Sequence, residues 1–407
     1  MMVAAIAWRN IRANKKRSIV TVALISLTTA LLVYSSAFMD GSHNKMIQAA
    51  VEIYPGYLQI TQRDFRDNPS YDNLILDTGA LHRLVEKTAG VAAHGARFET
   101  FVLYAAREKA VGAMLTGIEP EPEKLLSRLH SSLVKGRYLT KDDTNALYMG
   151  VELAKRLKVD VGDTLSFIGN GADYSFAADR VEVVGLFKTG LFDFDGGATF
   201  LNKPYFDQMM ASTDLATHYV VLPRQPAAVE ELAAGLRQQL SRDYRAESWR
   251  QTMGGLVEAM EVDSIFGYIT LGIIFIVIFF VIMIYTLLTV FSRIREIGIL
   301  RAIGTTPGQV LAMLLGESMI LSLLSVCLGG LIGGALAYYF YLNPMEFPSY
   351  EEQFKQYGLA VTSMPCAFEP LTILRDMAIM FLLSLLSGLY PIVKVNRYQP
   401  VEAMHHV

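Results

Sequence analysis

The sequence is poor in cysteine and in charge. Its only two cysteines, Cys327 and Cys366, lie in an apolar run and in a polar stretch, so we expect two free thiols. Charged residues make up 18% of the chain and hydrophobic ones 52%, with a mean hydropathy of +0.32. This balance indicates a membrane protein rather than a soluble one. The net charge of −3 offers no basic surface, so no nucleic-acid partner is expected.

The sequence also lacks the motifs of common catalytic sites. It contains no Walker A sequence, no His-x-x-x-His pair and no Gly-x-Ser-x-Gly. Gly169, Gly171 and the pair 196–197 are therefore predicted to be turn glycines between strands. Asp193 and Asp195 beside that pair are interpreted as exposed turn acids, with cation binding as the alternative. We expect no catalytic residue, no metal and no cofactor bound by this chain.

Long apolar runs are what the sequence has instead. Crossing the hydrocarbon core takes about 20 apolar residues, and uncharged runs occur at 18–38, 265–291, 318–342 and 377–393. A cleaved signal peptide is the alternative for the first run, although that run is longer than the roughly 7–15 residues of a signal peptide. The sequence predicts a membrane α-helical fold with transmembrane segments at 18–38, 263–292, 310–342 and 377–394.

Basic residues mark one side of the membrane. They precede the first run between Arg9 and Arg17, follow the second at Arg293, Arg295 and Arg301, and follow the fourth. The positive-inside rule places these ends, and both termini, in the cytoplasm. The domain 39–262 and the loop 343–376 are then extracytoplasmic, and the tail 395–407 is cytoplasmic. Residues 1–17 are predicted to form an amphipathic helix in the cytoplasmic interface, with a plain basic flank as the alternative.

The domain at 39–262 is predicted to be mixed α+β, because strand-like and helix-like stretches alternate without strict βαβ order. Helical character also continues past the membrane at 45–53 and 256–263, where we expect stalk helices. The predicted strands are 57–61, 101–105, 112–116, 175–189 and 218–222, and the predicted helices are 149–157, 204–210 and 227–240.

The segment 293–309 between the second and third runs is the most informative one. It predicts a short amphipathic helix at 297–303, with Gly298 near its start, Gly304 as its C-cap and Pro307 opening the next helix. The segment resembles the Arg-x-x-Glu-Ile-Gly-x-Leu-Arg-Ala-Ile-Gly motif of FtsX-like permeases, where it is the coupling helix that docks on an ATPase subunit. The resemblance implies coupling roles for Arg295, Glu296, Ile297, Gly298, Leu300, Arg301, Ala302 and Gly304.

The resemblance extends over most of the chain. Stretches at 117–120, 136–139, 150–164 and 183–187 are similar to the porter part of a MacB-like periplasmic domain, and 246–251 is similar to the end of its sabre part. MacB carries a fused ATPase, whereas this chain has no Walker motif. The resemblance therefore implies that a separate ABC ATPase subunit binds ATP and Mg²⁺, and that a second permease copy or paralogue completes a dimer in the lipid membrane.

Two features of the third run call for explanation. Glu317 is an ionisable residue among apolar ones, so it either faces the bundle interior in a coupling role or extends to the interface. Gly329, Gly330, Gly333 and Gly334 form two overlapping Gly-x-x-x-Gly pairs. Such small faces allow close helix contact in lipid, here either within the chain or across a dimer.

The resemblance implies a bacterial inner-membrane permease that works by mechanotransmission. Segments 56–60 and 190–195 are most similar to the lipoprotein-releasing LolC/LolE-like branch, which passes lipoproteins to a periplasmic carrier. The alternatives are efflux of small amphiphiles or peptides with an adaptor protein, as in MacB, and FtsX-like signalling to cell-wall hydrolases.

Overall fold

The computed structural model describes residues 15–350 and 363–396; the interfacial helix predicted at 1–17 and the tail predicted at 395–407 lie almost wholly outside the described residues. The chain divides into two compact units. We call the first, Lys15–Lys45 with Met260–Glu346 and the part from Ser363, the helical unit. We call the second, Met46–Ala259, the α/β unit.

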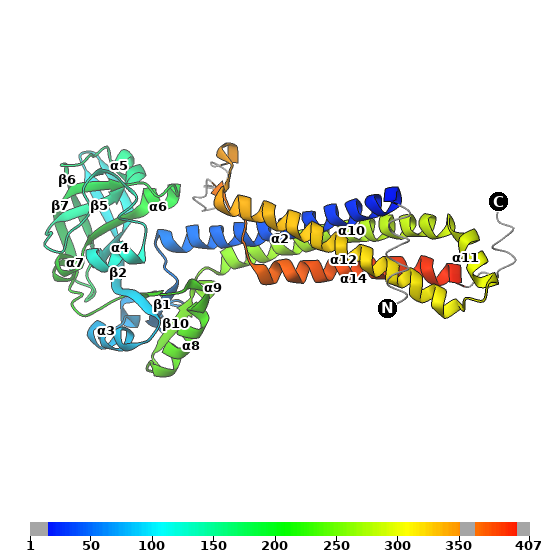
Figure 1. Ribbon diagram of the computed structural model, residues 1–407. Helices are drawn as coiled ribbons and strands as arrows, with labels where there is room; N and C mark the ends of the chain where they lie inside the picture. Colours follow the sequence, from blue (N-terminus) through cyan, green and yellow to red (C-terminus); the bar gives the residue numbers. More distant parts are fainter. Residues whose placement is uncertain (1–14, 351–362, 397–407) are drawn as a thin grey trace. The chain divides into compact units, whose positions relative to one another are not determined.

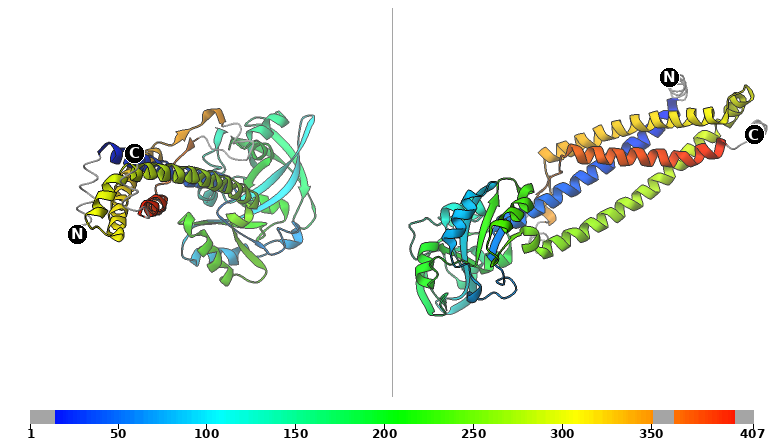
Figure 2. Two further views of the ribbon diagram at one scale, coloured as in Figure 1. Left: turned by 90° about the vertical axis from the view of Figure 1, so that its right-hand side faces the viewer. Right: turned by 90° about the horizontal axis from the view of Figure 1, so that it is seen from below.

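Within the described residues, four long helices are apolar enough to cross a membrane, and this confirms the predicted four-helix class. They are α2 (Lys15–Ile53), α10 (Gly254–Phe291), α12 (Pro307–Leu342) and α14 (Pro370–Asn396), and α12 and α14 lie side by side (Figure 1 and Figure 2). Both α2 and α10 include the stretches expected to be stalk helices.

The fourth long helix extends beyond the transmembrane segment predicted at 377–394. The fourth helix begins at Pro370 rather than at 377, so the preceding loop ends at Glu369. Arg375 and Asp376 interrupt the apolar run but not the helix, and their side chains contact each other at 3.2 Å. Proline favours the first turn of a helix, where its missing N–H costs nothing. A two-stranded sheet of β11 (Met345–Glu346) and β12 (Ser363–Met364) flanks this loop.

The α/β unit is built on one mixed ten-stranded sheet, which confirms the predicted α+β class. Its strand order is β10-β1-β9-β2-β3-β8-β5-β7-β4, with β6 pairing with both β2 and β7. The strands are β1 (Leu58–Gln62), β2 (Val91–Ala106), β3 (Lys109–Ile118), β4 (Leu133–Gly136), β5 (Ala146–Gly150), β6 (Thr164–Asn170), β7 (Phe176–Phe187), β8 (Ala198–Asn202), β9 (His218–Pro223) and β10 (Tyr244–Ser248).

Helices cover this sheet around separate apolar cores. One core gathers Leu58, Ile60 and Trp249 near β1, and another gathers Phe98 and Phe167 near the long strand β2. Because β2 contributes side chains to both, it joins the two halves of the unit. The helices are α3 (Thr78–Lys87), α4 (Pro120–Leu126), α5 (Val151–Leu157), α6 (Phe192–Gly197), α7 (Lys203–Met210), α8 (Val229–Gln239) and α9 (Trp249–Thr252).

Several local predictions in this unit were wrong. The helix expected from 149 begins at Val151, because the preceding residues form the buried strand β5. Gly169 lies in strand β6, and the pair 196–197 ends helix α6 instead of forming a turn. Asp195 is 2% exposed rather than an exposed turn acid. Its carboxylate accepts hydrogen bonds from the backbone N–H groups of Thr189 and Gly190, so it closes the loop before α6.

Candidate functional site

The segment between α10 and α12 folds as helix α11 (Ile294–Ala302), so the predicted helix begins earlier than expected. Gly298 consequently lies in the helix interior and not near its start. Gly304 follows the helix with a φ of +105°, a conformation that suits glycine because it has no Cβ. Thr306 and Gln309 form a capping box around Pro307, and this fixes the start of α12.

Helix α11 has an inner and an outer face. On the inner face Ile294 and Ile297 are 7% and 5% exposed and pack against α10, α12 and α14 in one apolar cluster. Gly298 is also buried. On the outer face Ile299 and Ile303 are 47% and 80% exposed.

The other predicted coupling residues divide between these faces. Gly298 is buried on the inner face and Arg301 is half-buried. The side chain of Leu300 lies outside the described residues. The outer face therefore combines apolar and charged side chains. Its exposed members among the predicted residues are Arg295, Glu296, Ala302 and Gly304.

Arg293, immediately before α11, holds the segment to α12. Its Nη1 donates to Oε2 of Glu317 at 2.8 Å, and its Nε donates to Oε2 of Glu296 at 3.0 Å. The side chains of Arg293 and Glu317 are 9% and 6% exposed, whereas that of Glu296 is 63% exposed. Glu317 thus faces the interior of the helical unit. Removing one member of a buried pair costs about 3–5 kcal/mol, because the other charge stays buried.

Hydroxyl side chains from the four long helices share a cavity with Glu317, together with apolar side chains. A cavity of about 50 Å³ is lined by Thr21, Thr286, Ser318 and Ser384 as well as by Glu317. A cavity of this size and polarity has room for a few water molecules. Hydroxyl groups and one ion pair can bind, orient and transmit displacement, but they supply no activated nucleophile.

The four glycines of the two Gly-x-x-x-Gly pairs in α12 face other helices of the same chain. A Cβ on Gly329 would lie 2.5 Å from the carbonyl oxygen of Ser26, and one on Gly333 would lie 2.8 Å from that of Ala30, both on α2. Gly330 faces Met377 of α14 in the same way, while Gly334 has more room, with its nearest neighbour at 3.8 Å. The Ser26 hydroxyl also donates to the Ser325 carbonyl at 2.8 Å.

The sequence did not identify Arg293 as the partner of Glu317. The two residues are 24 positions apart, and several arginines lie near the same membrane boundary. A usable signal existed, since a buried acid requires a cation, and Arg293 is the first residue of the family motif. Cys327 and Cys366 are both free thiols, as expected.

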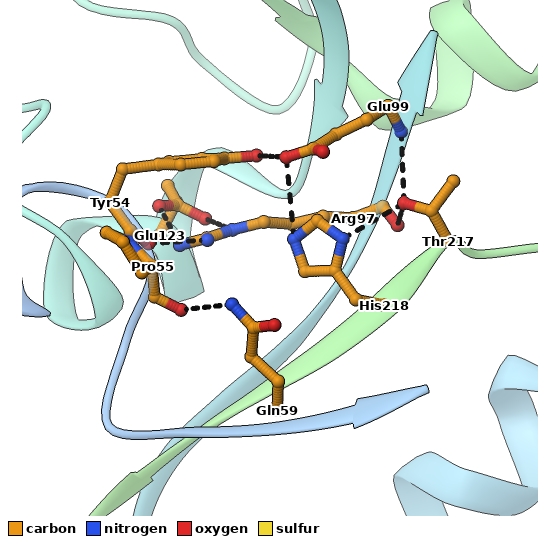
Figure 3. Close-up of polar contacts among 8 residues, drawn as sticks. All are labelled: Tyr54, Pro55, Gln59, Arg97, Glu99, Glu123, Thr217 and His218. Atoms are coloured by element: carbon orange, nitrogen blue, oxygen red, sulfur yellow. Dashed lines mark hydrogen bonds and ion pairs between the residues drawn. The ribbon is translucent and has the colours of Figure 1, made fainter. Parts of the chain in front are cut away.

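A second buried ion pair lies in the α/β unit. Arg97 on β2 contacts Glu123 on α4 through Nε at 3.0 Å and Nη2 at 2.7 Å, while its Nη1 donates to the Tyr54 carbonyl at 2.6 Å (Figure 3). Its guanidinium also lies 4.1 Å from the centre of the Tyr54 ring. The Tyr54 hydroxyl donates to Oε1 of Glu99 at 2.5 Å. Burial lowers the pKa of neighbouring His218 to about 4.

Two family models match the chain. Residues 18–239, more than half of the 407, match the MacB-like periplasmic core domain, and residues 268–400 match the FtsX-like permease C-terminal domain. The lipoprotein-releasing system transmembrane protein LolC of Xylella fastidiosa (strain Temecula1) is 24% identical over 311 residues, 74% of each chain. LolC of Neisseria meningitidis serogroup B is 21% identical over 429 residues, 99% of each chain.

Among solved structures, the periplasmic region of MacB from Actinobacillus actinomycetemcomitans is similar at 15% identity, with a TM-score of 0.38. The likeness covers 53% of this chain and 98% of that one.

Four membrane-crossing helices and an α/β domain of the periplasmic type define a bacterial membrane permease. The chain belongs to the FtsX-like family of ABC transporter permeases with a MacB-like periplasmic core domain. A permease of this type is not itself an ATPase.

Proposed function

We propose that this chain couples ATP hydrolysis by a separate ABC ATPase subunit to work outside the inner membrane, and that this work is lipoprotein release. ATP and Mg²⁺ bind to the partner subunit. Both termini and α11 lie in the cytoplasm, the α/β unit lies in the periplasm, and a second permease copy or paralogue completes the dimer. The basic residues beside α11 support this orientation, since basic residues are enriched on the cytoplasmic side.

The outer face of α11 is the observation that carries the coupling proposal. Ile303 is 80% exposed and Ile299 is 47% exposed, next to charged Arg295. Apolar side chains that project from a short helix outside an apolar span suit insertion into a groove of a partner. The inner face of the same helix is packed and clamped by Arg293, so force applied to the outer face reaches α12.

The continuity of two long helices supports mechanotransmission. Helix α2 runs without a break to Ile53, and α10 begins at Gly254. Each therefore carries on from its apolar span into residues of the α/β unit. A continuous helix transmits displacement along its axis because every turn is hydrogen-bonded to the next. In this scheme no substrate passes through a central pore.

The lipoprotein part of the proposal is supported by the relatives. Two matched LolC proteins are lipoprotein-releasing transmembrane proteins by name, and one aligns with 99% of this chain. The released lipoproteins would pass to a periplasmic carrier. The separate ATPase that the proposal requires also fits this branch, because the sequence contains no Walker A motif.

Ile303→Glu tests the coupling. We expect it to lower ATPase stimulation in nanodiscs about tenfold, because a charge replaces an apolar side chain at the interface. Leu125→Glu is the matched control, since Leu125 is 66% exposed on α4 of the α/β unit. Equal ATPase stimulation in the two variants would contradict the coupling role of α11.

A second measurement tests the lipoprotein part by itself. Proteoliposomes that contain the wild-type chain, its ATPase and a radiolabelled lipoprotein should release the label to a soluble carrier when ATP is added. If the ATPase remains coupled and no label is released, the lipoprotein assignment fails and the coupling assignment stands.

A further inference from the structure

A pocket of about 590 Å³ opens on the α/β unit beside the Arg97 network. Its walls come from segments far apart in the sequence: the stretch after β1, strands β2 and β3, and the turn between β6 and β7. The proposed coupling function does not use it. The side chains that matter here are Phe65, Tyr71, Phe101, Met114, Tyr174 and Glu99.

The apolar wall of this pocket is exposed to solvent. Phe101 is 67% exposed, Tyr174 60% and Met114 37%. Phe101 and Met114 face each other across the β2–β3 pairing, and the Phe101 ring lies over Gly112, where a Cβ would be 2.5 Å from the ring. Gly112 thus leaves room for the ring on the sheet surface. Exposed aromatic side chains that gather in one pocket are typical of a binding site.

Glu99 supplies a negative charge at the same place. It lies two residues before Phe101 on β2, and alternate residues of a strand share a face. Its Oε1 accepts the Tyr54 hydrogen bond at 2.5 Å and lies 3.6 Å from Nε2 of His218 (Figure 3). Its Oε2 has no hydrogen-bond partner among the described residues, and the Glu99 side chain lines the pocket.

Arg97 attracts the carboxylate of Glu99, but the charges of the buried groups around Glu99 do not balance. The positive charge of Arg97 is taken up by Glu123 through two hydrogen bonds. His218 is neutral at neutral pH because burial lowers its pKa to about 4, and Tyr54 stays protonated because burial raises its pKa. Arg97, Glu123, Glu99 and His218 therefore carry a net charge of −1.

We propose that this pocket binds an amphiphilic organic cation, a ligand with a protonated amine beside an apolar or aromatic body. The amine would contact Glu99 and the faces of the aromatic rings, which attract cations within about 6 Å of their centres. The body of the ligand would cover Phe101 and Met114. An anion of the same shape would be repelled by the carboxylate, and a neutral analogue would keep only the apolar contacts.

Three ligands with one body test the charge requirement. The probe is 4-phenylbutylamine, and the controls are 4-phenylbutanol and 4-phenylbutyrate. Binding is measured by saturation-transfer NMR on the full chain in nanodiscs, after subtraction of the signal from empty nanodiscs. We expect the amine to bind about tenfold more tightly than the alcohol, and the carboxylate not to bind. Equal affinity for amine and alcohol overturns the proposal.

Variants of the chain test the location. Glu99→Gln should lower the affinity for the amine about tenfold and leave the affinity for the alcohol unchanged, and Tyr174→Ser should weaken binding of both. Phe176→Ser is the matched control, because Phe176 is 75% exposed on β7 but does not line the pocket. Tyr174 is a surface residue, so Tyr174→Ser is expected to fold. It therefore still tests the location of the pocket if Glu99→Gln does not fold. Amine binding that is unchanged in Tyr174→Ser overturns the location.

Discussion

Two buried arginine–glutamate pairs stand in the two units of this molecule, and they differ in what surrounds them. In the α/β unit the side chains of Arg97 and Glu123 are 0% and 2% exposed, and the contact is bidentate. In the helical unit Arg293 gives Glu317 one hydrogen bond and gives its second to the exposed Glu296. The first pair is enclosed, whereas the second connects the interior to the surface.

The different surroundings of the two arginine–glutamate pairs indicate different roles for them. All the donors of Arg97 that contact Glu123 and Tyr54 stay within one packed region, so the pair can only hold that region together. Arg293 joins the acid of α12 to the acid of α11, and α11 is the segment with the exposed apolar face. A displacement of α11 therefore changes the contacts of a buried charge in the helical unit.

The largest expected effect comes from breaking the enclosed pair. Arg97→Met should lower the free energy of unfolding of the α/β unit by about 3–5 kcal/mol, because Glu123 is left as a buried unpaired charge. Trp249 fluorescence during urea unfolding measures this, since Trp249 belongs to a core of the unit.

Two further variants control for this prediction. Arg128→Met breaks the pair with Glu52, whose side chains are 40% and 27% exposed, and should cost less than about 1 kcal/mol. Replacing Arg97 and Glu123 together by apolar residues should recover part of the loss. A single Arg97→Met no more damaging than Arg128→Met would show that the enclosed pair is not structural.

The second expected effect is a pH dependence of the α/β unit near its enclosed pair. Burial lowers the pKa of His218 from 6.5 to about 4, so below pH 6.5 the unfolded chain binds a proton that the folded one does not. Stability is therefore retained above pH 6.5 and falls as the pH drops toward 4, by at most about 1.4 kcal/mol per pH unit.

Urea titrations at several pH values measure this dependence against a His218→Gln variant. The amide still hydrogen-bonds but does not titrate in this window, so the slope between pH 6.5 and 4 should flatten. Identical slopes for the two proteins would mean that His218 titrates normally in the folded state.

How far the sequence alone could predict these features depends on the range of the interactions involved. The four long helices follow from run length and hydropathy, which are local. The Arg293–Glu317 pair joins two helices, and no local pattern selects Arg293 among nearby arginines. The residues around Asp195 are typical of a turn. Its carboxylate accepts a hydrogen bond from the backbone of Thr189, and that contact forms only when the surrounding strands are in place.

A third effect is measured as activity and concerns the pair in the helical unit. Arg293→Gln removes the charged hydrogen bonds from Arg293 to Glu317 and Glu296, and it leaves the carboxylate of Glu317 buried without that cation. We expect the stimulated ATPase activity to fall about tenfold, since 1.4 kcal/mol corresponds to a factor of ten. Basal activity of the isolated ATPase subunit is the control.

Glu317→Gln in the Arg293→Gln background distinguishes loss of the link between α11 and α12 from the effect of a buried carboxylate that has lost Arg293. The double variant should restore membrane expression but not coupling, because no ion pair remains. Restored coupling would show that only charge balance matters, and that the link between α11 and α12 is not needed.

The smallest expected effect concerns Glu296, the exposed partner of Arg293. Glu296→Gln removes a surface partner whose side chain is 63% exposed, and such pairs contribute about 0–1 kcal/mol. Stimulated ATPase activity should change by less than about fivefold, and the change should shrink at high salt, which screens exposed charges. If Glu296→Gln matches Arg293→Gln at every salt concentration, the exposed acid carries the coupling and the buried one serves only to hold Arg293 in place.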